Sequence, residues 1–216
     1  MKKLIIALLM VIGIVTSSQA QLTLKPGFRA GVNFSKLTNY NADFKTGFYV
    51  GGELAIKFNT LYTLQPELNY SRQGGTSSSN IDNTYVSNTY DPIFYGESKV
   101  SYTIDYLSFS AISKFNFGNG FHLLVGPSLD FKVNDNFDNN SFSNGEQIGF
   151  DFSLVGGFGY SLPIGLSFEA RFKQGLVDIY GNNYNMNIDQ NNNGNFDEVV
   201  LNQSFQLGIS YTFNLK

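Results

Sequence analysis

An alternation of apolar and polar side chains, with a period of two residues, is the feature that most constrains this chain. Phe28, Ala30 and Val32 alternate in this way with Arg29 and Gly31. Successive side chains of a β-strand point to opposite faces, so each alternating stretch predicts a strand with one apolar face. Eight stretches show the pattern: 28–34, 48–58, 62–70, 107–117, 121–133, 150–162, 166–173 and 205–213. No stretch after residue 20 repeats every 3.6 residues, so we expect an all-β protein with essentially no helix.

Short and long connections alternate between these stretches. The short ones, Asn59–Thr60, Gly118–Gly120 and Pro163–Gly165, carry Gly, Asn or Pro at tight-turn positions. The long ones are polar and rich in Asn and Ser: 35–46, 71–101, 134–148 and 176–202. This order predicts an up-and-down antiparallel meander with both termini on the short-turn side. A meander of eight strands removes its exposed edges most simply by closing into a barrel.

The 71–101 connection leaves the number of strands open. It either extends the flanking strands beyond the barrel or contains an extra hairpin, built from Thr84–Val86 and Ile93–Tyr95. We expect eight strands, and ten strands are the alternative.

Pro66 and Pro127 lie in the middle of two predicted strands. Proline has no backbone N–H, so each residue removes one donor from the hydrogen-bond ladder. We therefore expect a bulge or weak pairing at both positions.

Charge and side-chain volume decide which face points inward. The apolar face of the eight stretches carries no charged residue, and many of its side chains are Phe or Tyr. The interior of an eight-stranded barrel is too narrow for so many large groups, so this face must point outward. An apolar exterior around a polar, charged interior is typical of a transmembrane β-barrel. The opposite face carries Gly, Ser and Thr with these charged residues: Arg29, Lys57, Lys114, Lys132, Arg171, Lys173, Glu53, Glu67, Asp130, Asp151 and Glu169.

The N-terminus has the composition of a secretory signal peptide. Lys2 and Lys3 precede an apolar run, Leu4–Val15, which is followed by the small and polar residues Thr16–Ala20. The run is too short to cross a bilayer as a helix. We therefore expect residues 1–20 to be a signal peptide and residues 21–216 to form one barrel domain. Export without helices is consistent with a closed barrel in the cell outer membrane.

Composition excludes several classes of function. The chain has no Cys, so disulfides and Cys-ligated metal or redox sites are absent. Removal of Lys2 and Lys3 leaves 12 of the 14 basic residues against 17 acidic ones, a net charge of −5. Nucleic acid is therefore not an expected partner.

Several segments resemble one family of membrane proteins. They are Gly31–Ser35, Leu64–Tyr70, Asp105–Leu107 with Lys114–Phe115, Gly126–Pro127, Gly156–Tyr160, Glu169–Phe172 and the last strand. Their order and spacing are similar to those of the outer-membrane β-barrel, or "porin family", proteins common in the Bacteroidota. Gln206–Phe213 resembles the C-terminal signal that the barrel-assembly machinery recognises during insertion. The resemblance implies an integral outer-membrane barrel.

Two features of the sequence are candidates for chemical sites. His122 is the only histidine, and the sequence suggests neither a metal-ligating partner nor a Ser-His-Asp arrangement for it. Residues 189–197 match the first half of an EF-hand-type calcium loop, but position 12 is Val200 instead of the bidentate Glu. A polar lumen residue and an Asn-rich loop tip are the preferred interpretations, so no catalytic, cofactor or metal site is predicted.

The charged lumen suggests what the barrel does. Long side chains of both signs in a narrow interior should pair with one another, because unpaired charges away from water are costly. We therefore expect a plugged barrel that acts as a structural or interaction scaffold, with a narrow passive channel for small solutes as the alternative. We do not expect an enzyme. The expected partners are the lipid bilayer, the barrel-assembly machinery, and envelope or extracellular proteins at the long loops, and we expect a monomer.

Overall fold

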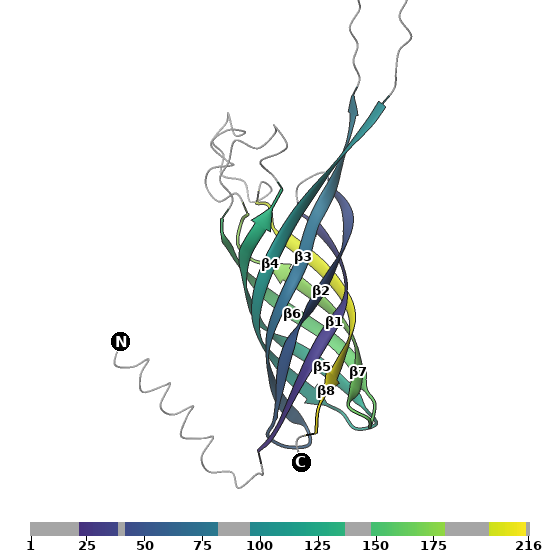
Figure 1. Ribbon diagram of the computed structural model, residues 1–216, viewed down its shortest axis with the longest axis vertical. Helices are drawn as coiled ribbons and strands as arrows, with labels where there is room; N and C mark the ends of the chain where they lie inside the picture. Colours follow the sequence, from purple (N-terminus) through teal and green to yellow (C-terminus); the bar gives the residue numbers. More distant parts are fainter. Residues whose placement is uncertain (1–21, 39–41, 82–95, 137–147, 180–198, 215–216) are drawn as a thin grey trace, which may run out of the picture.

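The computed structural model describes residues 22–38, 42–81, 96–136, 148–179 and 199–214. These residues form eight antiparallel strands in a closed barrel, with each strand beside its neighbours in the sequence (Figure 1). No helix among them is long and apolar enough to cross a membrane. The strands are β1 Thr23–Leu37, β2 Ala42–Lys57, β3 Tyr62–Ile81, β4 Gly96–Asn116, β5 Phe121–Asp135, β6 Phe150–Ser161, β7 Leu166–Gly175 and β8 Asn202–Thr212. The predicted all-β, eight-stranded fold is confirmed.

The first and last strands close the barrel. β1 pairs with β8 antiparallel, from Gly27 opposite Thr212 to Leu37 opposite Asn202. This pairing leaves no open edge on the barrel wall, which is the reason an eight-stranded meander closes. The start of β1 and the end of β8 lie at the same end of the barrel, beside the tight turns (Figure 1).

The three tight turns lie where the sequence predicts them. The side-chain oxygen of Asn59 accepts hydrogen bonds from the backbone N–H groups of Leu61 (2.9 Å) and Tyr62 (2.7 Å). Gly118, Asn119 and Gly120 have φ values of 64°, 49° and 88°, a left-handed conformation that Gly and Asn adopt readily. The first two turns join β2 to β3 and β4 to β5, and the third, which contains Gly165 with a φ of 89°, joins β6 to β7.

Several strands extend further toward the long connections than predicted. β1 runs to Leu37 and β2 begins at Ala42, so the predicted 35–46 loop is wrong for most of its length. β3 and β4 continue as a paired ribbon beyond the rim of the other strands (Figure 1), up to Ile81 opposite Gly96. The alternation of apolar and polar residues stops where the lipid-facing belt ends. It therefore underestimates the length of strands that continue into water.

The alternative of ten strands in the barrel wall is wrong for the residues that the structure describes. β3 and β4 pair directly with each other, and the barrel closes with eight strands. No further strand is therefore inserted into the wall between them. The segments 84–86 and 93–95 that suggested an extra hairpin lie outside the described residues.

Burial confirms the predicted inside and outside faces. Phe28, Phe121 and Phe158 on the outer face are 53%, 62% and 63% exposed. Arg29 and Glu67 on the opposite face are only 2% and 5% exposed. The apolar side chains thus form an outer belt, and the charged side chains fill the lumen.

The two mid-strand prolines interrupt the ladder without a bulge. Pro66 stays in register with Ala111 on one side, and Pro127 stays in register with Leu154 on one side. On the other side the pairing skips two residues at each proline and then resumes in the same register. Of the two expected alternatives, weak pairing is observed on one side of each proline, and no bulge forms at either position. A missing N–H affects only the neighbour toward which it would have pointed.

Candidate functional site in the barrel lumen

An ion pair crosses the lumen at its centre. Arg171 on β7 donates from Nη1 to Glu67 Oε2 (2.9 Å) and from Nη2 to Glu67 Oε1 (2.8 Å), on β3. β3 and β7 are four positions apart in the ring of eight strands, so they lie on opposite sides of the barrel. Arg29 on β1 donates to the same carboxylate. The two hydrogen bonds between Arg171 and Glu67 form a bidentate pair, which is among the stronger kinds of charged hydrogen bond in proteins.

Glu169 on β7 contacts three cationic side chains at the same level of the lumen. Its carboxylate lies 2.8 Å from Arg171 Nη2, 3.7 Å from Arg29 Nη2 and 3.9 Å from Lys114 Nζ. We call Arg29, Glu67, Glu169 and Arg171 the central ion-pair cluster. All four side chains are at most 2% exposed. Burial of such charges is tolerated only because each one has partners of opposite sign.

A neutral amide connects a third carboxylate to this cluster. Gln65 Nε2 donates to Glu53 Oε2 (2.9 Å) and to Glu67 Oε1 (2.8 Å). Glu53 and Glu67 are cross-strand partners on β2 and β3, so the amide lies between two like charges. Together with Lys114, the layer holds three cations and three carboxylates.

A second polar layer lies toward the long connections. Lys173 Nζ on β7 donates to Asp130 Oδ1 on β5 (2.6 Å), and Ser153 Oγ donates to Asp130 Oδ2 (2.7 Å). Asp151 is buried beside them and accepts a hydrogen bond from the backbone N–H of Val177 (3.2 Å). The charged side chains of this layer therefore also have hydrogen-bond partners within the barrel.

Two glycines make room for Tyr49 above Arg29. The ring of Tyr49 lies 4.8 Å from Arg29 Cζ, and its hydroxyl accepts a hydrogen bond from Arg29 Nη2 (3.3 Å). A Cβ atom at Gly31 or Gly208 would collide with this hydroxyl. Glycine at both positions thus lets an aromatic side chain fill the lumen beside the cluster. A cavity of about 20 Å³ remains there, which is room for about one water molecule.

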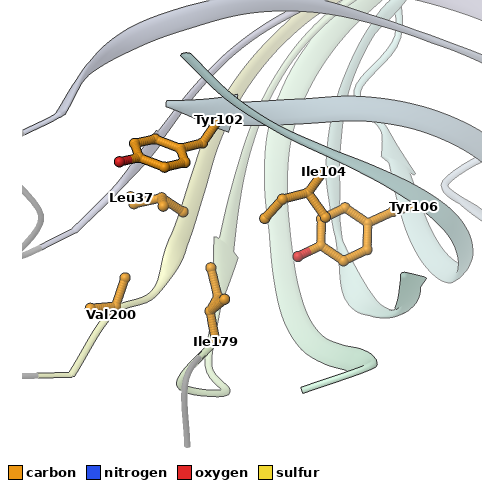
Figure 2. Packing of buried hydrophobic residues seen from close by; sticks show 6 residues of the cluster. All are labelled: Leu37, Tyr102, Ile104, Tyr106, Ile179 and Val200. Atoms are coloured by element: carbon orange, nitrogen blue, oxygen red, sulfur yellow. The ribbon is translucent and has the colours of Figure 1, made fainter. Parts of the chain in front are cut away.

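The end of the lumen near the long connections is apolar. Ile179 and Val200, from the connection between β7 and β8, pack inside the mouth (Figure 2). They contact Leu37 of β1 and a row on β4: Tyr102, Ile104 and Tyr106. The backbone N–H of Ile179 donates to the carbonyl of Val200 (2.9 Å) and fixes the two segments together. We call these six residues the apolar cap.

The apolar cap corrects the prediction of a wholly polar lumen. Tyr102, Ile104 and Tyr106 alternate in the opposite phase to Leu107 and Phe109, and therefore face inward. The sequence shows this change, because the apolar residues shift from even-numbered positions before residue 107 to odd-numbered positions after it. The predicted strand begins at Leu107 and therefore excludes this inward-facing row.

Nine of the eleven predicted lumen charges lie within the lumen, and two do not. Lys57 is exposed at the short-turn end of β2. Lys132 lies near the rim and pairs with Asp135 (2.7 Å). These two positions are at strand ends, where the alternation continues but the barrel no longer encloses the side chain.

His122 has more neighbours than the sequence suggested. Its Nδ1 lies 3.3 Å from Ser161 Oγ, and its Nε2 lies 3.6 Å from Glu169 Oε1. The sequence alone does not indicate these two neighbours, which lie on β6 and β7. The second distance is too long for a hydrogen bond, and Arg171 holds the same carboxylate at 2.8 Å. This geometry leaves the histidine without the tightly held carboxylate of a Ser-His-Asp site.

The structure gives no metal cluster in the part of the chain it describes. No group of three or more His, Asp or Glu side chains there is arranged to hold a metal ion. The 189–197 segment that resembles a calcium loop lies outside the described residues.

Comparisons with known proteins give the family. Neisserial surface protein A is similar in structure, with a TM-score of 0.50 and 13% identity, over 87% of this chain and 97% of that one. Ail of Yersinia pestis, solved with the heparin analogue sucrose octasulfate, gives a TM-score of 0.47 and 12% identity, over 88% of this chain and 99% of that one. No curated protein matches the sequence. The model of the outer membrane protein beta-barrel domain matches residues 18–181, and the chain therefore belongs to this family of barrels embedded in the outer membrane.

Proposed function

We propose that this protein is a closed outer-membrane scaffold of the Bacteroidota porin-family type, which presents its long connections to partners outside the cell. The observation that carries the proposal is the Arg171–Glu67 pair across the lumen, with both side chains at most 2% exposed. An interior filled by paired charges is rigid and leaves little room for solute.

Two further observations support a closed lumen. The cavity beside the central ion-pair cluster has only about 20 Å³. The apolar cap lies above it and buries Leu37 and Ile104 to 1% exposure. A solute would have to displace both a charged layer and an apolar layer.

Conductance in planar bilayers tests the proposal. We expect the refolded wild-type barrel to give no reproducible current steps, whereas a general porin measured in parallel gives them. Reproducible open-channel steps from the wild-type protein would contradict the closed scaffold and support the alternative, a narrow passive channel for small solutes.

Partner contact at the long connections is tested by cross-linking in intact outer membranes. We expect the wild-type protein to capture an envelope or extracellular protein, and a variant with shortened connections to lose it. Equal capture by both proteins would contradict a role of the connections.

We infer that the Ser161–His122–Glu169 contact is structural and that the protein is not an enzyme. The support is the 3.6 Å gap between His122 and Glu169 and the commitment of that carboxylate to Arg171. Wild-type protein should release no fatty acid from phospholipid vesicles. Hydrolysis that disappears in Ser161→Ala would contradict this inference.

We also propose that residues 1–20 are removed on export and that the barrel-assembly machinery inserts residues 21–216 as a monomer. N-terminal sequencing of protein isolated from outer membranes should begin at Gln21. A chain that still begins with Met1 would contradict the signal peptide.

A further inference from the structure

The outer wall of the barrel contains a groove within the apolar belt. It has a volume of about 510 Å³ and lies over β5, β6, β7 and β8. We propose that this groove binds one phospholipid acyl chain at the short-turn end of the barrel. The inference goes beyond the closed lumen, because it concerns the surface that faces the bilayer.

One small side chain forms the centre of the groove. Ala170 on β7 lies in register between Phe158 on β6 and Leu207 on β8. The next outward row is Tyr160, Phe168 and Ile209, in register on the same three strands. Phe158 is 63% exposed and Leu207 is 42% exposed, so both side chains stand out from the wall on the two strands that flank the alanine. A long, narrow occupant fits between such walls better than a flat one.

The place of the groove identifies the occupant as hydrocarbon. Its outward lining residues belong to the same exposed apolar belt that covers the barrel: Phe121, Phe158, Tyr160, Phe168, Leu207 and Ile209. The belt of an outer-membrane barrel faces acyl chains, and the groove is continuous with it. A groove of this volume is in the range of ligand sites and buries more of a chain than a flat wall does.

An aromatic pair marks the end of the groove near the tight turns. Phe121 and Tyr160 stack edge to face with their ring centroids 5.0 Å apart. Tyrosine prefers the membrane interface, where its ring is apolar and its hydroxyl contacts water or headgroups. A chain in the groove would therefore have its headgroup near these turns, in the periplasmic leaflet if the long connections face outward as proposed.

The groove offers no charge to a headgroup. Glu169 contributes to its floor, but the side chain is buried in the lumen and bound to Arg171. Recognition should therefore depend on the acyl chain alone. Phosphatidylethanolamine and phosphatidylglycerol should bind equally well.

Lipid retention in mild detergent tests the inference. Protein extracted from outer membranes is analysed by native mass spectrometry, alone and after addition of each of the two phospholipids. We expect about one retained phospholipid per wild-type chain. Ala170→Phe should fill the groove and lower retention at least fivefold, whereas Ala111→Phe, at an outward alanine on β4 away from the groove, should leave it unchanged.

A second pair of variants keeps the test informative if Ala170→Phe does not fold. Phe158→Ala removes one wall and should lower retention, while Phe109→Ala removes an outward ring on β4, away from the groove, and should not. Equal retention by groove and control variants would overturn the inference. Dimers that dissociate in Phe158→Ala would also overturn it, by showing a second copy in the groove. Neither result would alter the bilayer conductance, so the closed-lumen proposal is judged separately.

Discussion

At the scale of single residues, Glu67 is the most connected acceptor in the lumen. It accepts hydrogen bonds from Arg29, Arg171, Gln65 and Asn69, which come from β1, β3 and β7. Removing one member of such a cluster leaves charges that are buried and no longer compensated. The energetic cost of a substitution at Glu67 should therefore depend on charged partners on β1 and β7 as well as on amide neighbours along β3.

Glu67→Gln should destabilise the barrel by about 3–5 kcal/mol, because Arg29 and Arg171 lose their shared counter-charge. The measurement is urea unfolding of the refolded protein in lipid vesicles. Lys57→Gln, at an exposed charge on β2, is the control and should change the unfolding free energy by less than about 0.5 kcal/mol. A similar small change for both variants would show that the cluster does not hold the barrel together.

The double variant Glu67→Gln with Arg171→Gln tests the pair itself. Its cost should be smaller than the sum of the two single costs by about 0.5–3 kcal/mol, because the partners are in direct contact. Strict additivity would mean that the two side chains act independently.

The effect of a polar substitution depends on which face of the barrel wall carries it. Phe109 is 46% exposed in the belt and stacks on Phe131, whereas Ser210 is 2% exposed in the lumen. Phe109→Arg should cost about 2–4 kcal/mol near the bilayer midplane and impair assembly. Ser210→Thr should have little effect. Assembly is read from the shift between folded and heat-unfolded bands on a gel, and equal tolerance at both sites would reverse the assignment of inside and outside.

At the scale of elements, the β3–β4 ribbon extends beyond the part of the sheet that forms the barrel wall. β2 pairs with β3 only as far as Ser77, and beyond that point the described part of β3 pairs only with β4. The ribbon therefore adds long strands without adding to the wall. The sequence and length of such a projecting ribbon can change without disturbing the barrel.

Replacing residues 79–98 with Asn-Gly should leave the barrel folded. Ser78 and Lys99 are cross-strand partners, and a two-residue Asn-Gly loop matches that geometry. We expect the folded gel band and an unfolding free energy within about 1 kcal/mol of wild type. Replacement of the central Glu67–Asn69 row by glycines is the contrasting control and should abolish folding. Loss of the folded band in the trimmed variant would show that the ribbon is needed for assembly.

At the scale of the whole molecule, the lumen is organised in layers along the barrel axis. Along β7, Ser167 lies near the tight turns, Glu169 and Arg171 form the central ion-pair cluster, and Lys173 forms the next layer. The apolar cap closes the opposite end. The two ends of the barrel are therefore chemically different, as is expected for a protein whose ends face different compartments.

Single cysteines can establish the orientation, because the chain has no Cys of its own. Gly149 lies directly before β6 near the long connections, and a Cβ there would meet no atom within 4 Å. A membrane-impermeant maleimide should label Gly149→Cys in intact cells. It should label Thr60→Cys, in the tight turn between β2 and β3, only after the outer membrane is permeabilised. The reverse pattern would contradict outward-facing long connections.

The sequence by itself determined the architecture of this protein. A period of two fixes which side chains share a face, and the absence of charge from one face shows that this face meets lipid. The alternation of tight and long connections then determines the order of the strands. The eight-stranded barrel formed by residues 28–213 can therefore be predicted without knowledge of any contact. These properties are local, and local patterns are what a sequence displays directly.

Only the tertiary structure decided which lumen residues meet. Glu67 and Arg171 are 104 residues apart in the chain, and the closure and register of the barrel bring them together. The same is true of Ile179 and Val200 in the apolar cap, and of Ala170 between Phe158 and Leu207 in the outer groove. The period of two determines whether a side chain points inward or outward. Which residue that side chain meets across the barrel depends on the relative shift of all eight strands.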